Sequence, residues 1–203
     1  MMKLVLASKN EKKLREMDEI LSGMGIEVCL QSDAGIDVDV EETGTTFEEN
    51  SMLKAKAVME ASGLPAVADD SGLCVDALNG APGVYSARYG GEELDDAGRT
   101  KLLLSSMPKG GVRPAKFVSV ITCCFPGGDV LTARGECPGT IAFAPMGTGG
   151  FGYDPVFFLP GLKKTFAQLS PEEKNAVSHR GKALEAFAEK LAEYVVTFSP
   201  EKK

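Results

Sequence analysis

The chain has 203 residues, of which 43% are hydrophobic and 25% charged, a balance that suits one compact domain and excludes a disordered chain. Its net charge of −7, with basic residues spread along the chain, argues against electrostatic binding to nucleic acid or to an anionic membrane. The early apolar run LVLA is too short for a signal peptide and no segment approaches the ~20 apolar residues of a membrane span, so we expect a cytoplasmic protein.

Strand and helix patterns alternate along the first half of the chain. Residues 3–7, KLVLA, form a buried-strand run, and residues 10–25 follow as an amphipathic helix. Residues 26–31 alternate like a strand, and residues 46–63 predict a second helix that glycine and proline stop. The short run PAVA, residues 65–68, predicts a strand that ends at two aspartates.

The second half continues in the same way. A helix is predicted near residues 92–107, and a hairpin of two long strands at residues 116–125 and 130–137. Residues 151–161 contain a strand bounded by prolines. The last segment, from residue 170 to about 196, is helical, and its glycine could interrupt it. The alternation favours an α/β fold.

The chain shows no repeat and no linker-like stretch, so we expect a single domain over residues 1–203 with a short charged tail at residues 199–203. Its five cysteines lack CxxC spacing and only one histidine is present. These residues argue against a structural zinc site and indicate reduced, mostly buried thiols.

Two adjacent carboxylates, Asp69 and Asp70, follow the short PAVA strand. Adjacent like charges repel, so the pair needs either full solvation or a cation that neutralises it. Glu41 adds a further acid from a loop, whereas Glu49 has capping-box spacing to a threonine and hence a structural explanation. Such a set could offer oxygen ligands to Mg²⁺, which takes one or two carboxylates plus water and phosphate oxygens. The alternative is a solvated acidic loop.

The segment ASKNEKK, residues 7–13, joins the end of a strand to the start of a helix. Ser8 and Asn10 supply polar groups there, and free N–H groups at a helix N-terminus bind phosphate. Lysines in the first turn, Lys13 among them, oppose the helix dipole, and a bound polyphosphate would explain them. The alternative is an ordinary N-cap beside solvated lysines.

Residues 147–152, GTGGFG, match the dinucleotide pattern GxGxxG only formally, because that pattern must open a helix and here YDP and a strand follow. Such glycines either let a backbone approach a ligand or form turns. The only histidine, His179, lies with Lys174 and Arg180 before a helical packing stripe. A lone histidine is more often structural, and such cations are usually solvated.

Several motifs together resemble the inosine triphosphate pyrophosphatase family: ASKN with Lys13, EETG, TFEENS, ADDSGL, GAPGVYSARY, GTGGFGYDP and SHRGKAL, in this order and spacing. The resemblance covers roughly residues 3 to 195. It implies an α/β fold with an elongated, mixed, twisted β-sheet flanked by helices, two lobes with a central substrate cleft, and commonly a homodimer. Lys9 departs from the family pattern, in which many members carry glycine.

The resemblance also implies an activity, the Mg²⁺-dependent hydrolysis of non-standard purine nucleoside triphosphates (ITP, dITP and XTP) to the monophosphate and pyrophosphate. Asp70 would hold Mg²⁺ with Glu41 and act as general base on water, with Asp69 alongside. Contacts to phosphate or sugar would come from Ser8, Lys9, Asn10, Lys13 and Ser71. The base pocket would consist of Phe151, which stacks on the purine, and Gly152, Tyr153, Asp154, Lys174, His179 and Arg180.

Three alternatives remain open. A pyrophosphatase of the septum-inhibitor type would share the fold and the metal chemistry but act on other nucleotides. A haloacid-dehalogenase-type phosphatase needs aspartates in DxD spacing, whereas these are adjacent, and would release orthophosphate. A nucleotide-binding sensor would keep the pocket without turnover.

Overall fold

The computed structural model describes residues 2–198, and the predicted charged tail lies outside them. The chain forms two compact units. The first unit comprises Met1–Asp70, Ser119–Gly135 and Gly181–Lys203, and the second comprises Ser71–Val118 and Glu136–Arg180. Their arrangement as two lobes of one domain stays a prediction.

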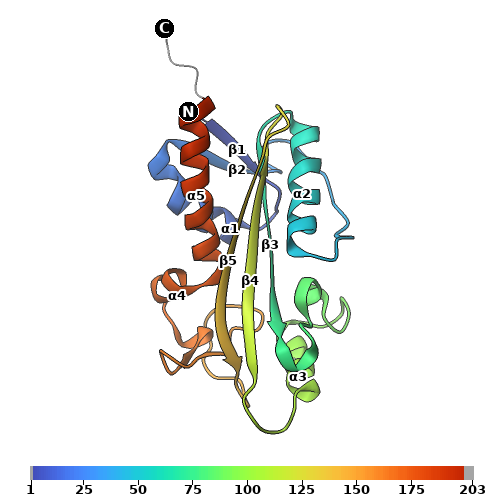
Figure 1. Ribbon diagram of the computed structural model, residues 1–203. Coiled ribbons are helices and arrows are strands. Elements are labelled where there is room, and N and C mark those ends of the chain that lie inside the picture. Colours follow the sequence, from blue (N-terminus) through green and yellow to red (C-terminus); the bar gives the residue numbers. More distant parts are fainter. Residues whose placement is uncertain (1, 199–203) are drawn as a thin grey trace. The chain divides into compact units, whose positions relative to one another are not determined.

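In the described part of the chain, a mixed sheet of seven strands forms the framework, in the order β2-β1-β3-β4-β5-β6-β7, and Figure 1 shows its long strands β3, β4 and β5 side by side. The strands are β1 (Met2–Leu6), β2 (Ile26–Leu30), β3 (Ala66–Val75), β4 (Pro114–Cys124), β5 (Val130–Ile141), β6 (Phe157–Leu159) and β7 (Lys164–Thr165). β1 pairs in parallel with both β2 and β3, whereas β6 pairs antiparallel with β5 and β7. The predicted α/β fold with a mixed sheet flanked by helices is confirmed. The elongated shape and the central cleft stay predictions.

Within residues 2–198, five α-helices accompany the sheet: α1 (Glu11–Leu21), α2 (Phe47–Ser62), α3 (Asp96–Ser106), α4 (Pro171–Val177) and α5 (His179–Phe198). The first helix ends before the predicted Gly25, because a 3-10 turn carries the chain to that glycine, whose φ of 70° is left-handed. The C-terminal helical segment breaks at Ser178 rather than at Gly181. Ser178 has extended backbone, with φ −73° and ψ 157°, and this separates α4 from α5.

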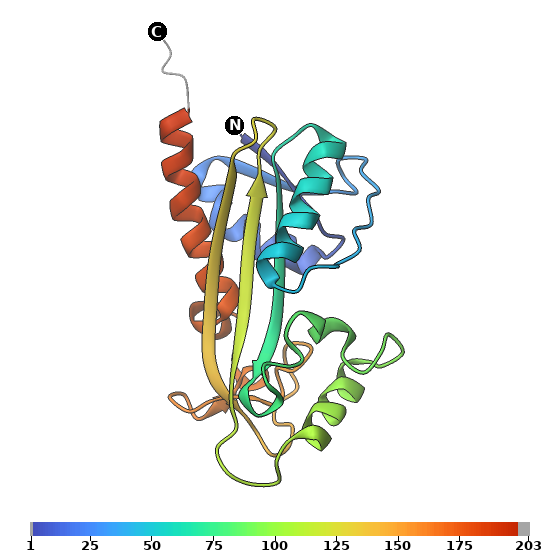
Figure 2. The same ribbon diagram turned by 45° about the vertical axis from the view of Figure 1, so that its right-hand side comes forward.

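Side-chain alternation along the strands of the first unit sends apolar groups to both faces of the sheet. One face packs against α1 and α5, and its core contains Leu4, Leu6, Val67, Met17, Leu21, Leu184, Phe187 and Leu191. The other face packs against α2, through Val5 and Ala66 with Val58 and through Ala68 with Ala55. Figures 1 and 2 show α5 and α2 on either side of β3. The buried leucines and phenylalanine of α5 confirm the predicted packing stripe.

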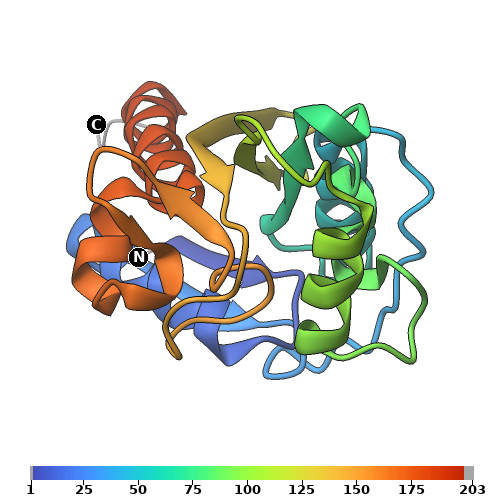
Figure 3. The same cartoon turned by 90° about the horizontal axis from the view of Figure 1, so that it is seen from below.

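The second unit has its own core around three phenylalanines. Phe117 of β4 lies edge-on to Phe157, with ring centroids 4.6 Å apart, and stacks with Phe166 at 5.7 Å. The view from below in Figure 3 shows α3 beside the turns of this unit. The GTGGFG segment is joined to this region by the Gly149 N–H, which donates to the carbonyl of Ala167, the residue after Phe166, at 3.1 Å.

Candidate active site

The two aspartates lie within a strand and not beyond its end. β3 continues through both of them to Val75, so the expectation of a short strand that stops before the pair was wrong. Consecutive side chains of a strand point to opposite faces. Asp69 therefore shares the face of Val67, toward α1, and Asp70 shares the face of Ala68, toward α2.

Each carboxylate has a lysine of its own. Lys13 Nζ of α1 lies 2.7 Å from Asp69 Oδ1, and the Asp69 side chain is 4% exposed. Lys54 Nζ of α2 lies 2.9 Å from Asp70 Oδ1, and the Asp70 side chain is 8% exposed. The mutual repulsion of the pair is thus relieved by two ammonium groups on two faces. The alternative of a fully solvated acidic loop does not hold for this pair.

Asp70 has the more elaborate surroundings. Asn50 Nδ2 donates to its Oδ2 at 3.3 Å, and Lys54 also donates to Glu42 Oε1 at 2.6 Å. Burial raises the pKa of Asp70 above its ordinary value, although the Lys54 ammonium pulls that pKa down. Burial lowers the pKa of Lys54, but Asp70 and Glu42 together raise it above its ordinary value. The result is a buried, oriented carboxylate beside a firmly protonated lysine.

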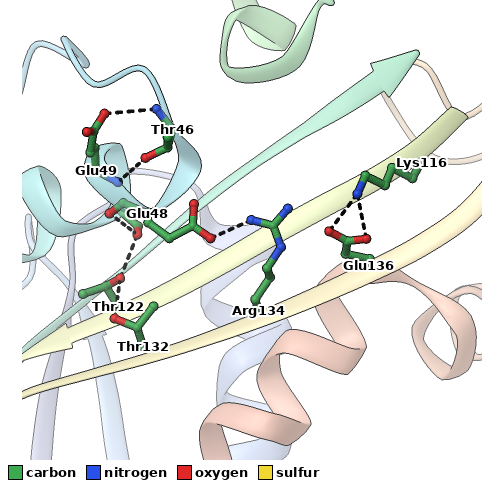
Figure 4. Close-up of polar contacts among 9 residues, drawn as sticks. Thr46, Glu48, Glu49, Lys116, Thr122, Thr132, Arg134 and Glu136 are labelled. Carbon is green, nitrogen blue, oxygen red and sulfur yellow. Dashed lines mark hydrogen bonds and ion pairs between the residues drawn. The ribbon is translucent and has the colours of Figure 1, made fainter. Parts of the chain in front are cut away.

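Polar contacts hold the first turns of helix α2, the helix that carries Asn50 and Lys54, in place (Figure 4). Its N-terminus has the predicted capping box, in which Thr46 and Glu49 bind each other's backbone N–H. Glu48 accepts from Arg134 Nη1 of β5 at 2.6 Å, and Ser51 Oγ lies 2.7 Å from Thr122 Oγ1 of β4. These contacts tie the first turns of α2 to the sheet.

Three members of this group, Glu42, Asn50 and Lys54, were not singled out from the sequence. Asn50 and Lys54 are four residues apart, and residues at that spacing share one helix face. This spacing was the available signal, but only the position of Asp70 relative to α2 gives it meaning. We call Lys13, Glu42, Asn50, Lys54, Asp69 and Asp70 the carboxylate cluster.

The predicted phosphate-binding turn is largely satisfied by its own side chains. Asn10 Oδ1 accepts from the N–H groups of Lys12 and Lys13 at 2.9 and 3.4 Å, and Ser8 Oγ accepts from the Asn10 N–H at 3.1 Å. This confirms the N-cap. Lys9 Nζ lies 3.2 Å from the exposed Asp37. The phosphate contacts of these residues and of Ser71 stay predictions.

The carboxylate cluster suits a hard cation that needs only one or two ligands from the protein. Among residues 2–198 the structure has no group of three or more His, Cys, Asp or Glu side chains placed to hold a metal. Mg²⁺ commonly takes only one or two carboxylates and completes its shell with water and phosphate oxygens. Asp70 fits that requirement. Glu41 is exposed, and its role as a second ligand stays a prediction, as does Mg²⁺ itself.

In the second unit, Phe151 stands at the edge of a tight loop. Phe151 is 47% exposed, and Lys174 Nζ and Arg180 Cζ lie 4.6 and 5.9 Å from the centroid of its ring. Asp154 Oδ2 accepts from the Phe151 N–H at 2.9 Å and from Lys174 Nζ at 2.6 Å. Burial raises the pKa of Asp154, and Lys174 opposes that rise. An exposed aromatic ring flanked by two cations is a surface on which a flat, polar ring can stack.

Other predicted residues of this group lie deeper. Tyr153 is buried, and its hydroxyl donates to the Ser86 carbonyl at 2.9 Å. His179 is 8% exposed and stacks on Phe117 with a centroid distance of 4.7 Å. Tyr153 thus joins the loop to the rest of the unit, and His179 packs against the phenylalanine core. Their contact with a substrate stays a prediction.

The glycines of the loop have a steric role. A Cβ on Gly150 would collide with the Asp154 carboxylate, and its φ of 74° is left-handed. Glycine is therefore needed for Asp154 to reach back to Phe151. We call Phe151, Asp154, Lys174 and Arg180 the aromatic cluster. A cavity of about 560 Å³ lies beside it, lined by the glycine loop, by Pro145 and Pro155, and by α3, and this volume is in the range of small-molecule sites.

The comparison with known proteins places these clusters in a family. The model of the Ham1 family matches residues 4–190. The chain belongs to the Ham1 family. The matched range includes every residue of the carboxylate and aromatic clusters.

Ham1 relatives match along nearly their whole length. The dITP/XTP pyrophosphatase of Haemophilus influenzae is 51% identical over 193 residues, with 93% of this chain and 98% of the relative covered. That of Shigella flexneri is 48% identical over 195 residues, with 94% and 98% covered. A solved HAM1 protein from Coxiella burnetii superposes with a TM-score of 0.90 at 44% identity, covering 95% of this chain and all of that one. The predicted family is confirmed.

Proposed function

We propose that the protein hydrolyses non-standard purine nucleoside triphosphates, ITP, dITP and XTP, to the monophosphate and pyrophosphate, and so removes them from the nucleotide pool. The observation that carries this proposal is the buried Asp70, held by Lys54 and Asn50, in a Ham1 chain whose relatives are named dITP/XTP pyrophosphatases.

The carboxylate cluster would act on the triphosphate. Asp70 would accept a proton from the water that attacks the α-phosphorus, and its raised pKa makes it a stronger base than an ordinary aspartate. Lys13 and Lys54 would neutralise phosphate oxygens, each moving between its aspartate and the substrate. Phosphoryl transfer needs positioning and charge neutralisation more than covalent help. We propose Mg²⁺ as the cofactor, held by Asp70 with Glu41, and when bound it would neutralise phosphate charge.

The aromatic cluster would bind the base. The purine would stack on Phe151, and Arg180 beside that ring would donate to the 6-oxo group that hypoxanthine and xanthine carry and adenine lacks. His179 is buried against Phe117, so Arg180 is the stronger candidate for this contact.

We further propose that the protein is a cytoplasmic homodimer. Across residues 2–198, no helix is both long and apolar enough to span a membrane. Size-exclusion chromatography with light scattering would measure the oligomeric state, and a monomer at micromolar concentration would contradict the dimer.

The function is tested with a panel of nucleoside triphosphates, assayed separately for pyrophosphate, orthophosphate and monophosphate, with Mg²⁺ and with chelator. We expect ITP and XTP to yield monophosphate and pyrophosphate, ATP, CTP and UTP to be poor substrates, and chelator to abolish turnover. Release of orthophosphate alone would contradict the proposed mechanism. Binding of ITP without turnover would indicate a nucleotide-binding sensor.

A further inference from the structure

Helix α3 holds the loop of the aromatic cluster through two side chains that belong to neither the carboxylate cluster nor the aromatic cluster. Asp96 Oδ2 accepts from the N–H of Gly152 at 2.7 Å, and Thr100 Oγ1 donates to the carbonyl of the same glycine at 3.3 Å. Asp96 and Thr100 are four residues apart and hence share one face of the helix. Both backbone groups of Gly152 are thereby bound by α3.

Gly152 is a point at which the loop could otherwise change shape. Its φ of 57° is left-handed, and nothing lies within 4 Å of the position that a Cβ would occupy. Glycine has wide backbone freedom because it has no Cβ. The two hydrogen bonds from α3 remove that freedom.

Phe151 is joined to this anchor through a single peptide bond, the one whose N–H Asp96 binds. Phe151 is 47% exposed, and its backbone N–H donates to Asp154 Oδ2 at 2.9 Å. The peptide between Phe151 and Gly152 is fixed by Asp96. Rotation of that peptide would swing the ring away from Lys174 and Arg180.

We propose that Asp96 and Thr100 are positioning residues that fix the Phe151 ring for base stacking. This rests on the proposed function, in which the purine stacks on Phe151. Neither residue belongs to the carboxylate cluster. Their loss should therefore weaken binding of the base and leave the chemical step and the binding of pyrophosphate unchanged.

The test must separate this role from helix stability, because Asp96 also lies in the first turn of α3, where a carboxylate favours the helix. Asp95 provides the control. It caps α3 by accepting from the Gly98 N–H at 2.7 Å and is not bonded to Gly152. Asp95→Ala should destabilise the start of α3 at least as much as Asp96→Ala. Asp96→Asn keeps a side-chain oxygen that can accept from Gly152.

We expect Asp96→Ala to raise KM for ITP and the Kd of IMP by about 5- to 10-fold, the effect of losing one ordinary hydrogen bond, because Asp96 acts on the base only through the loop. The kcat for ITP and the inhibition constant of pyrophosphate should stay within about twofold of wild type. Asp96→Asn should recover most of the affinity for IMP. Thr100→Val should raise the Kd of IMP less than Asp96→Ala does. An unchanged Kd for IMP in Asp96→Ala, or an equal rise in Asp95→Ala, would overturn the proposal.

A second measurement does not depend on turnover. Amide hydrogen exchange of the peptide spanning residues 147–154 should accelerate in Asp96→Ala and remain near wild type in Asp95→Ala. If wild type neither hydrolyses ITP nor binds IMP, the proposed function fails, and the exchange data still decide whether Asp96 holds the loop. Equal exchange in Asp96→Ala and wild type would overturn the positioning role.

Discussion

Asp69 and Asp70 are consecutive residues of β3 whose carboxylates lie on opposite faces of the sheet, each within 3 Å of a different lysine. The lysine of Asp69 comes from α1 and that of Asp70 from α2. Two neighbouring acids therefore have different lysine partners, and Asp70 also accepts from the side-chain amide of Asn50. This division leads us to expect different consequences when each is altered.

Asp70→Asn should lower turnover of ITP by a factor on the order of 10²–10⁴, the range of a lost general base. Asp69→Asn should lower it less, because Asp69 acts through Lys13 in the proposed mechanism. Steady-state kinetics at saturating Mg²⁺ would measure both. Near-normal turnover in Asp70→Asn would remove the general-base assignment, and equal losses would contradict the division of roles.

The stability of Asp70→Asn should improve relative to wild type as pH rises. Burial raises the folded-state pKa of Asp70, so its contribution to stability is fully present below its unfolded pKa, about 3.9, and is lost as pH rises through the raised value. Asparagine cannot ionise and escapes that loss. Thermal unfolding at pH 4 and pH 7 would give the two Tm differences, and the prediction is wrong if they are equal.

Lys54→Met should shift the acid limb of the kcat/KM profile for ITP to higher pH. Lys54 lowers the pKa of Asp70, so its removal lets that pKa rise further and the base protonates earlier on acidification. Breaking this buried pair should also cost stability on the order of 3 kcal/mol at neutral pH. Lys56→Met, on the same helix but 61% exposed, is the control and should change neither quantity. A profile that moves to lower pH would refute the assignment.

Arg180→Ala should reduce kcat/KM for ITP and narrow the ratio of ITP to ATP by about 5- to 150-fold, the worth of a well-made contact to a base edge. Lys13→Ala should lower kcat/KM for ITP and ATP by the same factor, because Lys13 lies beside Asp69 in the carboxylate cluster. Measuring kcat/KM for both nucleotides in both variants shows which residue contacts the base and which contacts only the phosphates. If the ratio is unchanged in Arg180→Ala, this residue does not read the base.

Much of the framework follows from local patterns in the sequence. The capping box at Thr46, the Asn10 cap and the packing stripe of α5 were all predicted, because caps and helix periodicity involve residues close in the chain. The family was also evident, since its motifs are ordered along one chain. These features need no knowledge of which elements touch.

The surroundings of the site residues were decided only by the tertiary structure. The sequence indicated that Asp69 and Asp70 need a partner but predicted a strand that stops before them, whereas strand alternation separates them between α1 and α2. Lys54 and Asp96 have unremarkable sequence contexts. Each becomes part of a site because a helix far away in the chain packs where its side chain reaches Asp70 or Gly152. Such contacts arise from the packing of distant segments, and no pattern within a single segment encodes them.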